Sequence, residues 1–300
     1  MKIRGKGNRI FDIVVIIILM IIVLIMIYPM YFTILASLSN PYAVSRGDVV
    51  WKVVGFTLEP YQNVIRNNQI WTGFYNTIIN TAIVTVYNLV LTIPCAYVLS
   101  RKVLPIRYIL MTYFMITMYF SGGMIPSYLL VRDLGILNTR WSLILPVGFS
   151  VYNMIIARSF FQSSFSQELF DAASIDGASE FRVFTSVVLP LSGSIIAVIA
   201  LYVAVANWNS YFNALLYVDD KRLFPLQYVL RNILIAEEGM SIGDMSSMQV
   251  EEIDVMLRRQ LMAKGMKYSL VFISSAPMML IYPFVQKHFV KGVMIGAVKG

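Results

Sequence analysis

Long apolar stretches separated by shorter polar ones make up most of the chain. In the first of them, no residue from Ile13 to Ser45 is charged. A helix needs roughly 20 mostly apolar residues to cross the hydrocarbon core of a bilayer, and these stretches are long enough. The pattern therefore predicts an all-α integral membrane protein with six transmembrane helices, at about residues 13–35, 74–99, 108–124, 141–161, 190–217 and 268–286.

Composition supports a membrane protein and argues against an enzyme. Hydrophobic residues make up 58% of the chain and charged residues 13%, whereas a soluble domain carries about 25% charged residues. The single cysteine, Cys95, and the single histidine, His288, leave little with which to build a zinc site or a catalytic triad. We expect one membrane domain over residues 1–300, with no catalytic residue, no metal site and no cofactor bound by this chain.

The basic residues indicate how the helices are oriented. Lys and Arg divide evenly between the two predicted sides, but on one side they lie close to the ends of the spans, in the two termini and in the turn Arg101 to Arg107. Such short basic segments are typical of the cytoplasmic face. Both termini and the polar stretch 162–190 are therefore expected in the cytoplasm. The sequence pI of about 9.5 then indicates contact with anionic lipid rather than nucleic acid.

The energy for transport is expected to come from another protein. The chain has no G-x-x-x-x-G-K-[ST] motif, so it is not expected to bind nucleotide. The predicted spans carry almost no charge in their interiors, although ion-coupled transporters rely on intramembrane ionisable residues. The outer segment 219–267 is charged, with amphipathic helices predicted at 223–235 and 249–262.

One polar stretch between the fourth and fifth spans reads as two short helices around a glycine turn. Gly177 permits the reversal of the backbone, and Pro190 suits the first turn of the next helix, where its missing N–H is not needed. The small side chains of Ala172 and Ala173 would let the first helix sit close against a partner. Asp171 is expected in a first helical turn, where the helix dipole favours a negative charge.

The spacing in this stretch resembles the EAA loop of type I ATP-binding-cassette importer permeases. That pattern is E-A-A, three residues, G, nine residues, then I-x-L-P. The chain has Asp171-Ala172-Ala173, Gly177 and Val187-Val188-Leu189-Pro190 at matching distances. Asp171 replaces the glutamate and Val187 replaces the isoleucine. The wider sequence, including AASIDGAS and the final GAVKG, is similar to the second permease of oligosaccharide importers of the maltose type.

The resemblance implies a permease that works with several partners. These are a second, different permease subunit, two ATPase subunits that bind ATP and Mg, an extracytoplasmic sugar-binding protein and membrane lipid. It also implies that the tail Lys291 to Gly300 contacts the ATPase. The residues expected to couple to the ATPase are Glu168, Asp171, Ala172, Ala173, Asp176, Gly177, Glu180, Leu189 and Pro190.

Polar and aromatic residues in the fourth and fifth spans are candidates for lining a sugar pathway. Aromatic rings stack on sugar rings, and amides bond to hydroxyls. Asn residues at membrane depth must face a partner helix or an aqueous cavity, so interhelical hydrogen bonds and an interfacial aromatic belt are the structural alternatives. The candidates are Asn153, Asn207, Trp208, Asn209, Tyr211 and Asn213.

Two other functions remain open from the sequence. The same architecture could carry an amino acid, a polyamine or an anion, which the charge of a partner binding protein's cleft would reveal. A membrane-embedded enzyme or a structural subunit is the other class. Co-purification without an ATPase would favour the structural alternative.

Overall fold

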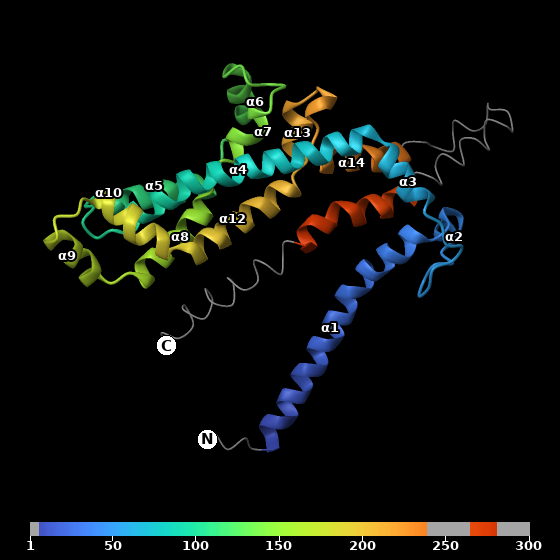
Figure 1. Cartoon of the computed structure of the whole chain (residues 1–300), viewed down its shortest axis with the longest axis horizontal. Helices are drawn as coiled ribbons and strands as arrows, with labels where there is room; N and C mark the ends of the chain where they lie inside the picture. The colour runs from blue at the N-terminus through green and yellow to red at the C-terminus, as the bar shows by residue number, and fades with distance from the viewer. Residues whose placement is uncertain (1–5, 239–264, 281–300) are drawn as a thin grey trace. The chain divides into compact units, whose positions relative to one another are not determined.

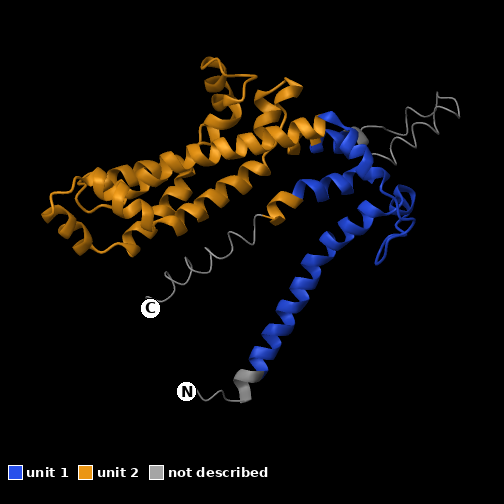
Figure 2. Cartoon of the chain, viewed as in Figure 1, with its two compact units in different colours: residues 1–68, 230–275 blue, residues 69–229, 276–300 orange. Residues whose placement is uncertain are grey.

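The structure is a computed structural model that describes residues 6–238 and 265–280. Regular secondary structure within these residues is entirely helical. The chain divides into two compact units, Met1–Asn68 with Leu230–Ser275 and Gln69–Val229 with Ala276–Gly300 (Figure 2). The predicted helix at 249–262, the end of the sixth span at 281–286 and the C-terminal tail lie outside the described residues.

Unit 1 is built around the long first helix. α1 (Lys6–Leu38) contains a stretch of 29 residues, Ile10–Leu38, that is long and apolar enough to span a membrane. The end of α1 packs on α3 (Glu59–Arg66), where the Ser37 and Tyr61 hydroxyls lie 2.8 Å apart. Phe32 packs edge-on against Tyr268, with ring centroids 5.7 Å apart. α2 (Pro41–Arg46) connects α1 to the loop before α3.

Unit 2 contains a bundle of helices that pack along one another (Figure 1). A shared apolar core joins these helices, with Val84, Met154, Ile199 and their neighbours buried inside it. The helices of the bundle are α4 (Asn68–Ser100), α5 (Arg107–Tyr119), α8 (Val151–Ser164) and α12 (Gly193–Trp208).

The inner face of α4 carries a line of polar residues at intervals of four. Residues spaced by four lie on one face of a helix, and Asn76, Asn80, Asn88 and Thr92 are all buried. Arg140 donates hydrogen bonds to Asn80 Oδ1 at 2.7 Å and to Asn76 Oδ1 at 2.9 Å. Asn76 in turn donates to the carbonyls of Arg222 and Phe224, so this part of the line holds the fold together.

Short helices form the part of unit 2 that lies beyond the bundle, and α13 packs against both α6 and α7. Asn138 ties this part together, because its N–H donates to the Tyr217 carbonyl and its side-chain oxygen accepts from the N–H groups of Asp219 and Asp220. The helices are α6 (Met124–Asp133), α7 (Trp141–Ile144), η1 (Leu145–Val147), α13 (Phe212–Tyr217), η3 (Lys221–Leu223) and α14 (Leu226–Glu238), the last of which continues into unit 1.

Three of the predicted spans are bent. Of the described helices, Ile10–Leu38 and Asn68–Ser100 could each cross a membrane alone, and three further pairs could do so only as two helices joined at a bend. The third predicted span stops at Tyr119, and the chain turns by 107° into α6 through Gly123, whose φ is +89°. The helix of the fifth span begins at Gly193 rather than at Pro190, after a bend of 76°.

Candidate functional site

The polar stretch after α8 folds as two short helices at one end of the unit 2 bundle (Figure 1). They are α9 (Gln167–Ile175) and α10 (Glu180–Val183), and they are followed by the π-helix η2 (Phe184–Val188) and by α11 (Leu189–Leu191). We call residues 167–191 the coupling segment. Glu168 occupies the first turn of α9, whereas Asp171, expected in a first turn, lies one turn later and accepts a hydrogen bond from Gln167 at 2.9 Å.

Gly177 makes the turn between the two helices, as predicted. Its φ of +69° lies in the left-handed region, which glycine adopts without the steric cost paid by other residues. The N–H of Ala178 reaches back to the Ala173 carbonyl at 3.0 Å, and the N–H of Asp176 reaches the Ala172 carbonyl at 3.1 Å. A Cβ built on Gly177 meets no atom within 4 Å, so the backbone angle, and not space, demands glycine here.

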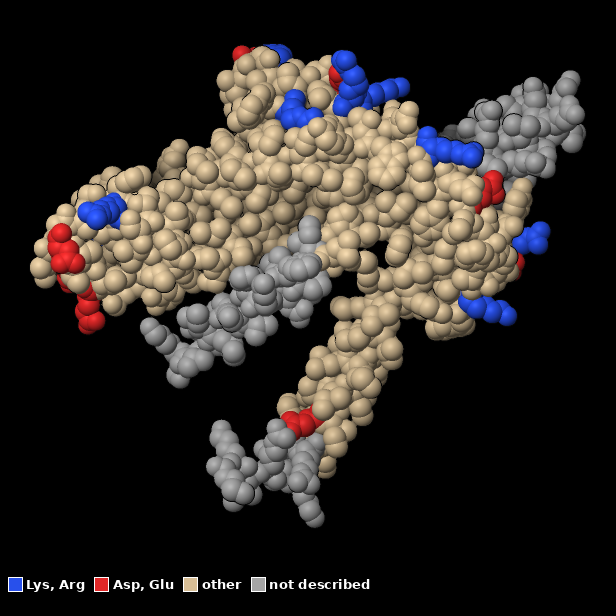
Figure 3. Space-filling view, in the orientation of Figure 1, with Lys and Arg blue, Asp and Glu red and all other residues tan. Residues whose placement is uncertain are grey.

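The two alanines face different surroundings. Ala173 is half-buried and packs against the core of unit 2, while Ala172 is exposed. Two larger apolar side chains are more exposed than either: Ile175 at 87% and Phe181 at 76%. Figure 3 shows acidic side chains at this end of unit 2, and Glu168, Asp171 and Asp176 are exposed on or beside α9. The outer surface of the coupling segment is therefore apolar at two points and acidic around them.

A buried arginine fixes the coupling segment to the end of α4. Arg101 donates a hydrogen bond to Glu180 Oε1 at 3.0 Å, and its guanidinium carbon lies 3.5 Å from the centre of the Phe170 ring. Tyr97 donates to Glu180 Oε2 at 3.0 Å. The hydrogen bond from Arg101 is the main cause that lowers the pKa of Glu180, so the Glu180 carboxyl is ionised at neutral pH. Both helices of the segment are thus held by one helix end.

Aromatic rings extend this attachment into the bundle. The Tyr97 ring lies 4.9 Å from Phe184, 6.0 Å from Phe161 and 6.4 Å from Phe170, measured between centroids. Phe161 is on α8 and Phe170 on α9, so one ring contacts three other elements. A displacement of α9 would therefore press directly on α4 and α8, because close-packed side chains transmit strain.

Leu189 and Pro190 lie where the segment joins the bundle. Both are exposed, and Val188 before them is buried. π-helical turns often occur at functional sites, and here one directly precedes Pro190. The chain then bends at Ser192, whose buried hydroxyl donates to the Val188 carbonyl at 2.6 Å.

A cavity of about 250 Å³ lies within unit 2, between α4, α8 and α12, and we call it the polar cavity after the amides and hydroxyls set in its otherwise apolar wall. Asn153 and Asn207, two of the predicted pathway residues, line it together with Asn88, Ser150 and Ser210. Asn207 donates a hydrogen bond to Thr81 at 3.0 Å. Asn88 is fully buried and accepts from Thr92, but its Nδ2 has no hydrogen-bond partner among the described residues. A buried donor without a partner is costly, which marks this cavity as a place for a polar guest.

The other predicted pathway residues lie elsewhere. Trp208 is buried edge-on against Phe74, with centroids 5.7 Å apart. Asn209 is exposed and bonds to the Val205 carbonyl of its own helix, and Tyr211 is exposed. Asn213 lines a much smaller cavity that Asn207 also touches. Asn88 was not among the predicted residues, although the spacing of four along α4 was visible in the sequence.

Comparisons with known proteins agree with this arrangement. A family model described as "Binding-protein-dependent transport system inner membrane component" matches residues 70–295. Protein LplC of Bacillus subtilis strain 168 is 37% identical over 295 residues, which are 98% of this chain and 97% of LplC. The polygalacturonan/rhamnogalacturonan transport system permease protein YtcP of the same strain is 36% identical over 293 residues, 98% of this chain and 99% of YtcP.

A solved structure shares the fold. A chain in the crystal structure of a bacterial ABC transporter involved in the import of the acidic polysaccharide alginate superposes with a TM-score of 0.83 and 29% sequence identity. The match covers 96% of this chain and 100% of that one.

Proposed function

Because the chain belongs to the family of binding-protein-dependent transport system inner membrane components, we propose that it is one of two permease subunits in an ATP-driven importer of oligosaccharides. Family membership confirms the resemblance drawn from the Asp171 to Pro190 spacing. The all-helical permease fold predicted from the sequence is also confirmed. Relatives and family alike are transport permeases, and the chain is a membrane component rather than an enzyme.

The coupling segment carries the proposal. It exposes two large apolar side chains, Ile175 and Phe181, among acidic residues. Large apolar side chains exposed outside the membrane indicate a surface that a partner covers. The same segment is held by Arg101 and Glu180 to the helix that lines the polar cavity. A partner that pushes on α9 would therefore move α4. We infer that this partner is an ATPase subunit that binds ATP and Mg and supplies the energy.

The polar cavity supports a sugar as the cargo. Its wall combines apolar side chains, such as Val84 and Val203, with amides and hydroxyls that bond to sugar hydroxyls, and Asn88 has a donor without a partner among the described residues. YtcP is a permease of a polygalacturonan/rhamnogalacturonan transport system, and the transporter of similar structure is involved in the import of the acidic polysaccharide alginate. We propose that Asn88, Asn153 and Asn207 line part of the pathway, and that a second, different permease closes the other side and a sugar-binding protein delivers the cargo.

The orientation of the chain in the membrane follows from the proposed contact with an ATPase subunit. The coupling segment must face the cytoplasm to meet an ATPase, and the basic turn Arg101 to Arg107 lies at the same end of the bundle. Short basic segments next to spans favour the cytoplasmic side. With an even number of spans, both termini would then be cytoplasmic.

The decisive experiment is to purify the complex with its partners and reconstitute it in vesicles. ATP hydrolysis and uptake are measured with neutral oligosaccharides, with oligosaccharides of uronic acids, and with amino acids, polyamines and inorganic anions. We expect at least one oligosaccharide to stimulate hydrolysis and to accumulate in the vesicles. Stimulation by a non-sugar solute alone would contradict the sugar assignment, and purification without any ATPase would contradict an ATP-driven importer.

A further inference from the structure

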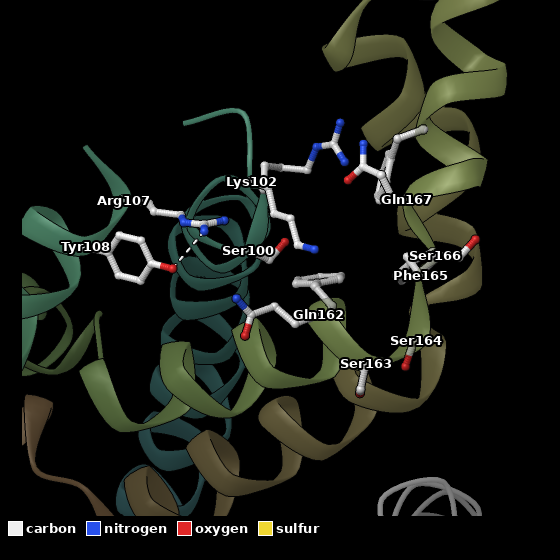
Figure 4. A pocket seen from close by; sticks show the side chains of 13 residues that line it. Ser100, Lys102, Arg107, Tyr108, Gln162, Ser163, Ser164, Phe165, Ser166 and Gln167 are labelled. Carbon is white, nitrogen blue, oxygen red and sulfur yellow. Dashed lines mark hydrogen bonds between the residues drawn. The ribbon is translucent and has the colours of Figure 1, made fainter. Parts of the chain in front are cut away.

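A second, larger pocket lies at the coupling end of unit 2. Its volume is about 600 Å³, within the range of sites that hold small molecules. The end of α4, the start of α5 and the chain that leads from α8 into α9 enclose it, and Figure 4 shows the side chains that line it. The pocket is separate from the polar cavity, and the two share no lining residue.

The charges around this pocket have one sign. Arg101, Lys102 and Arg107 line it, and none of the described residues that line it is acidic. Figure 4 shows the Lys102 ammonium and the Gln162 side chain directed into the same space as Ser100, with Arg107 beside them. Further hydroxyls and amides complete the lining, from Ser163, Ser164, Ser166 and Gln167. Such a wall supplies hydrogen-bond donors and positive charge for an anion.

Arg101, which lines this pocket, has a hydrogen-bond donor that no described residue uses. Its side chain is only 10% exposed, and one guanidinium nitrogen binds Glu180. Its Nε is buried and has no hydrogen-bond partner among the described residues. A buried charged donor without a partner is costly, and this donor belongs to a side chain in the wall of the pocket.

From these observations we propose that the pocket binds a phosphate group, supplied by the headgroup of an anionic phospholipid or by free phosphate. Arginine and lysine are the residues that bind phosphate in proteins, the first through paired hydrogen bonds and the second as a point charge. The turn that carries Lys102 and Arg107 lies between two membrane helices, where lipid headgroups are found, and basic pockets between helices on the cytoplasmic side suit such headgroups. The site does not depend on which solute the importer carries.

The test uses the whole purified complex. A double variant, Lys102→Gln with Arg107→Gln, removes two charges from the pocket and leaves Arg101 paired with Glu180. Arg182→Gln is the matched control, because Arg182 is exposed on α10 at the same end of unit 2 and does not line the pocket. Size-exclusion chromatography establishes that each variant still assembles.

Two arms separate the possible sources. In the first, complexes are extracted from vesicles of phosphatidylcholine that contain a minor fraction of phosphatidylglycerol, and bound lipid is counted by native mass spectrometry. In the second, inorganic phosphate is added to complexes in phosphatidylcholine alone, and the shift in melting temperature is measured. We expect wild type and Arg182→Gln to retain phosphatidylglycerol and the double variant to bind it about thirtyfold more weakly, as the loss of two basic groups implies.

Each result decides the proposal. Retained phosphatidylglycerol identifies a lipid headgroup, and a phosphate-dependent shift in pure phosphatidylcholine identifies free phosphate. Equal binding of phosphatidylglycerol or phosphate by the double variant and wild type would overturn the proposal. An equal loss of binding in Arg182→Gln and the double variant would also overturn it, because it would show attraction to a charged surface rather than binding at a site. If neither probe binds and the double variant instead weakens attachment of the ATPase, the basic pocket serves a protein partner and the proposal is wrong.

Discussion

Arg101 and Glu180 are 79 residues apart in the sequence and form an ion pair of 3.0 Å. Arg101 directly follows the helix that lines the polar cavity, and Glu180 begins the second helix of the coupling segment. The pair therefore joins the surface on which a partner would act to the part of the membrane bundle that must move. Its arginine is buried, while the Glu180 side chain is 63% exposed, so water screens part of the attraction.

Breaking this pair should loosen the coupling segment without unfolding the bundle. Glu180→Gln removes the charge and keeps the shape of the side chain. A partly exposed pair contributes about 1 kcal/mol at most, so we expect transient opening of the segment to rise about fivefold. The measurement is the rate at which trypsin cleaves after Arg182 in the isolated permease, since such cleavage follows the population of the open form.

A double-mutant cycle with Arg101→Gln isolates the interaction between the two residues. Arg101→Gln also loses the contact with the Phe170 ring, so it should be cleaved at least as fast as Glu180→Gln, and the double variant should be cleaved no faster than Arg101→Gln. Asp171→Asn is the control, because its hydrogen bond to Gln167 is local and exposed, and it should be cleaved like wild type. Additive effects of the two substitutions would show that Arg101 and Glu180 act independently.

Substitutions at Gly177 should rank by how well each residue adopts a positive φ. A non-glycine residue in the left-handed region costs roughly 1–2 kcal/mol, and asparagine tolerates it best. No atom lies near a Cβ at this position, so Gly177→Asn should retain most coupled transport, Gly177→Ala less and Gly177→Val least. Uptake and ATP hydrolysis are measured together in vesicles.

The ratio of uptake to hydrolysis is the informative quantity for these variants. Membrane insertion should be unchanged in all three, since Gly177 lies outside the bundle core. A Gly177→Val importer that transports at the rate of wild type would exclude a coupling role for the turn. An equal loss in Gly177→Asn and Gly177→Val would show that size, rather than backbone angle, is what matters.

Exposed apolar residues of the coupling segment should be needed for assembly rather than for folding. Ile175→Asp and Phe181→Asp place a charge on side chains that are almost free of contacts within the chain. The permease should keep its melting temperature and lose the ATPase on affinity purification. Val103→Asp, at an exposed apolar position in the turn after α4, should keep it. Retention of the ATPase by both variants would contradict docking at this surface.

The coupling segment was predictable because its signals are local. The spacing from Asp171 to Pro190 lies within one stretch, and Gly177 is required by a single backbone angle. The partners of Glu180 were not predictable, because Tyr97 and Arg101 come from a distant part of the chain and nothing in their neighbourhood distinguishes them from other residues at a helix end.

In the membrane helices, too, local features were predictable from the sequence and contacts between distant residues were not. Apolar length predicted the spans that the helices Ile10–Leu38 and Asn68–Ser100 could form, whereas the helix of the third predicted span ends at Tyr119 rather than near residue 124. The bend at Ser192 was missed, because hydropathy does not register a change in helix direction. Trp208 was predicted near the pathway from its type, yet packing against Phe74 buries it. The burial of Asn88 could have been predicted, because Asn88 is spaced by multiples of four from Asn76, Asn80 and Thr92. This spacing places all of them on one face of a helix, and that face is buried.

The two asparagines Asn76 and Asn88 lie on the same face of α4 and should behave differently when changed to leucine. Asn76 makes three hydrogen bonds, to Arg140, Arg222 and Phe224. Asn76→Leu leaves buried polar partners unsatisfied, and we expect a loss of about 2–3 kcal/mol in stability. Asn88 has one bond, to Thr92, and a donor without a partner, so Asn88→Leu should change the melting temperature little.

Uptake per assembled complex should fall more in Asn88→Leu than in Asn76→Leu, which is the opposite of their order in stability. If the polar cavity is part of the sugar pathway, Asn88→Leu removes a hydroxyl-binding amide and should lower uptake by about tenfold, the loss expected for one hydrogen bond of about 1.4 kcal/mol. The measurement is uptake per assembled complex, with Asn209→Leu as control because Asn209 is exposed outside the cavity. Normal uptake by Asn88→Leu would exclude a role for Asn88 in binding the substrate, and normal uptake by Asn153→Leu and Asn207→Leu as well would exclude the cavity from the pathway.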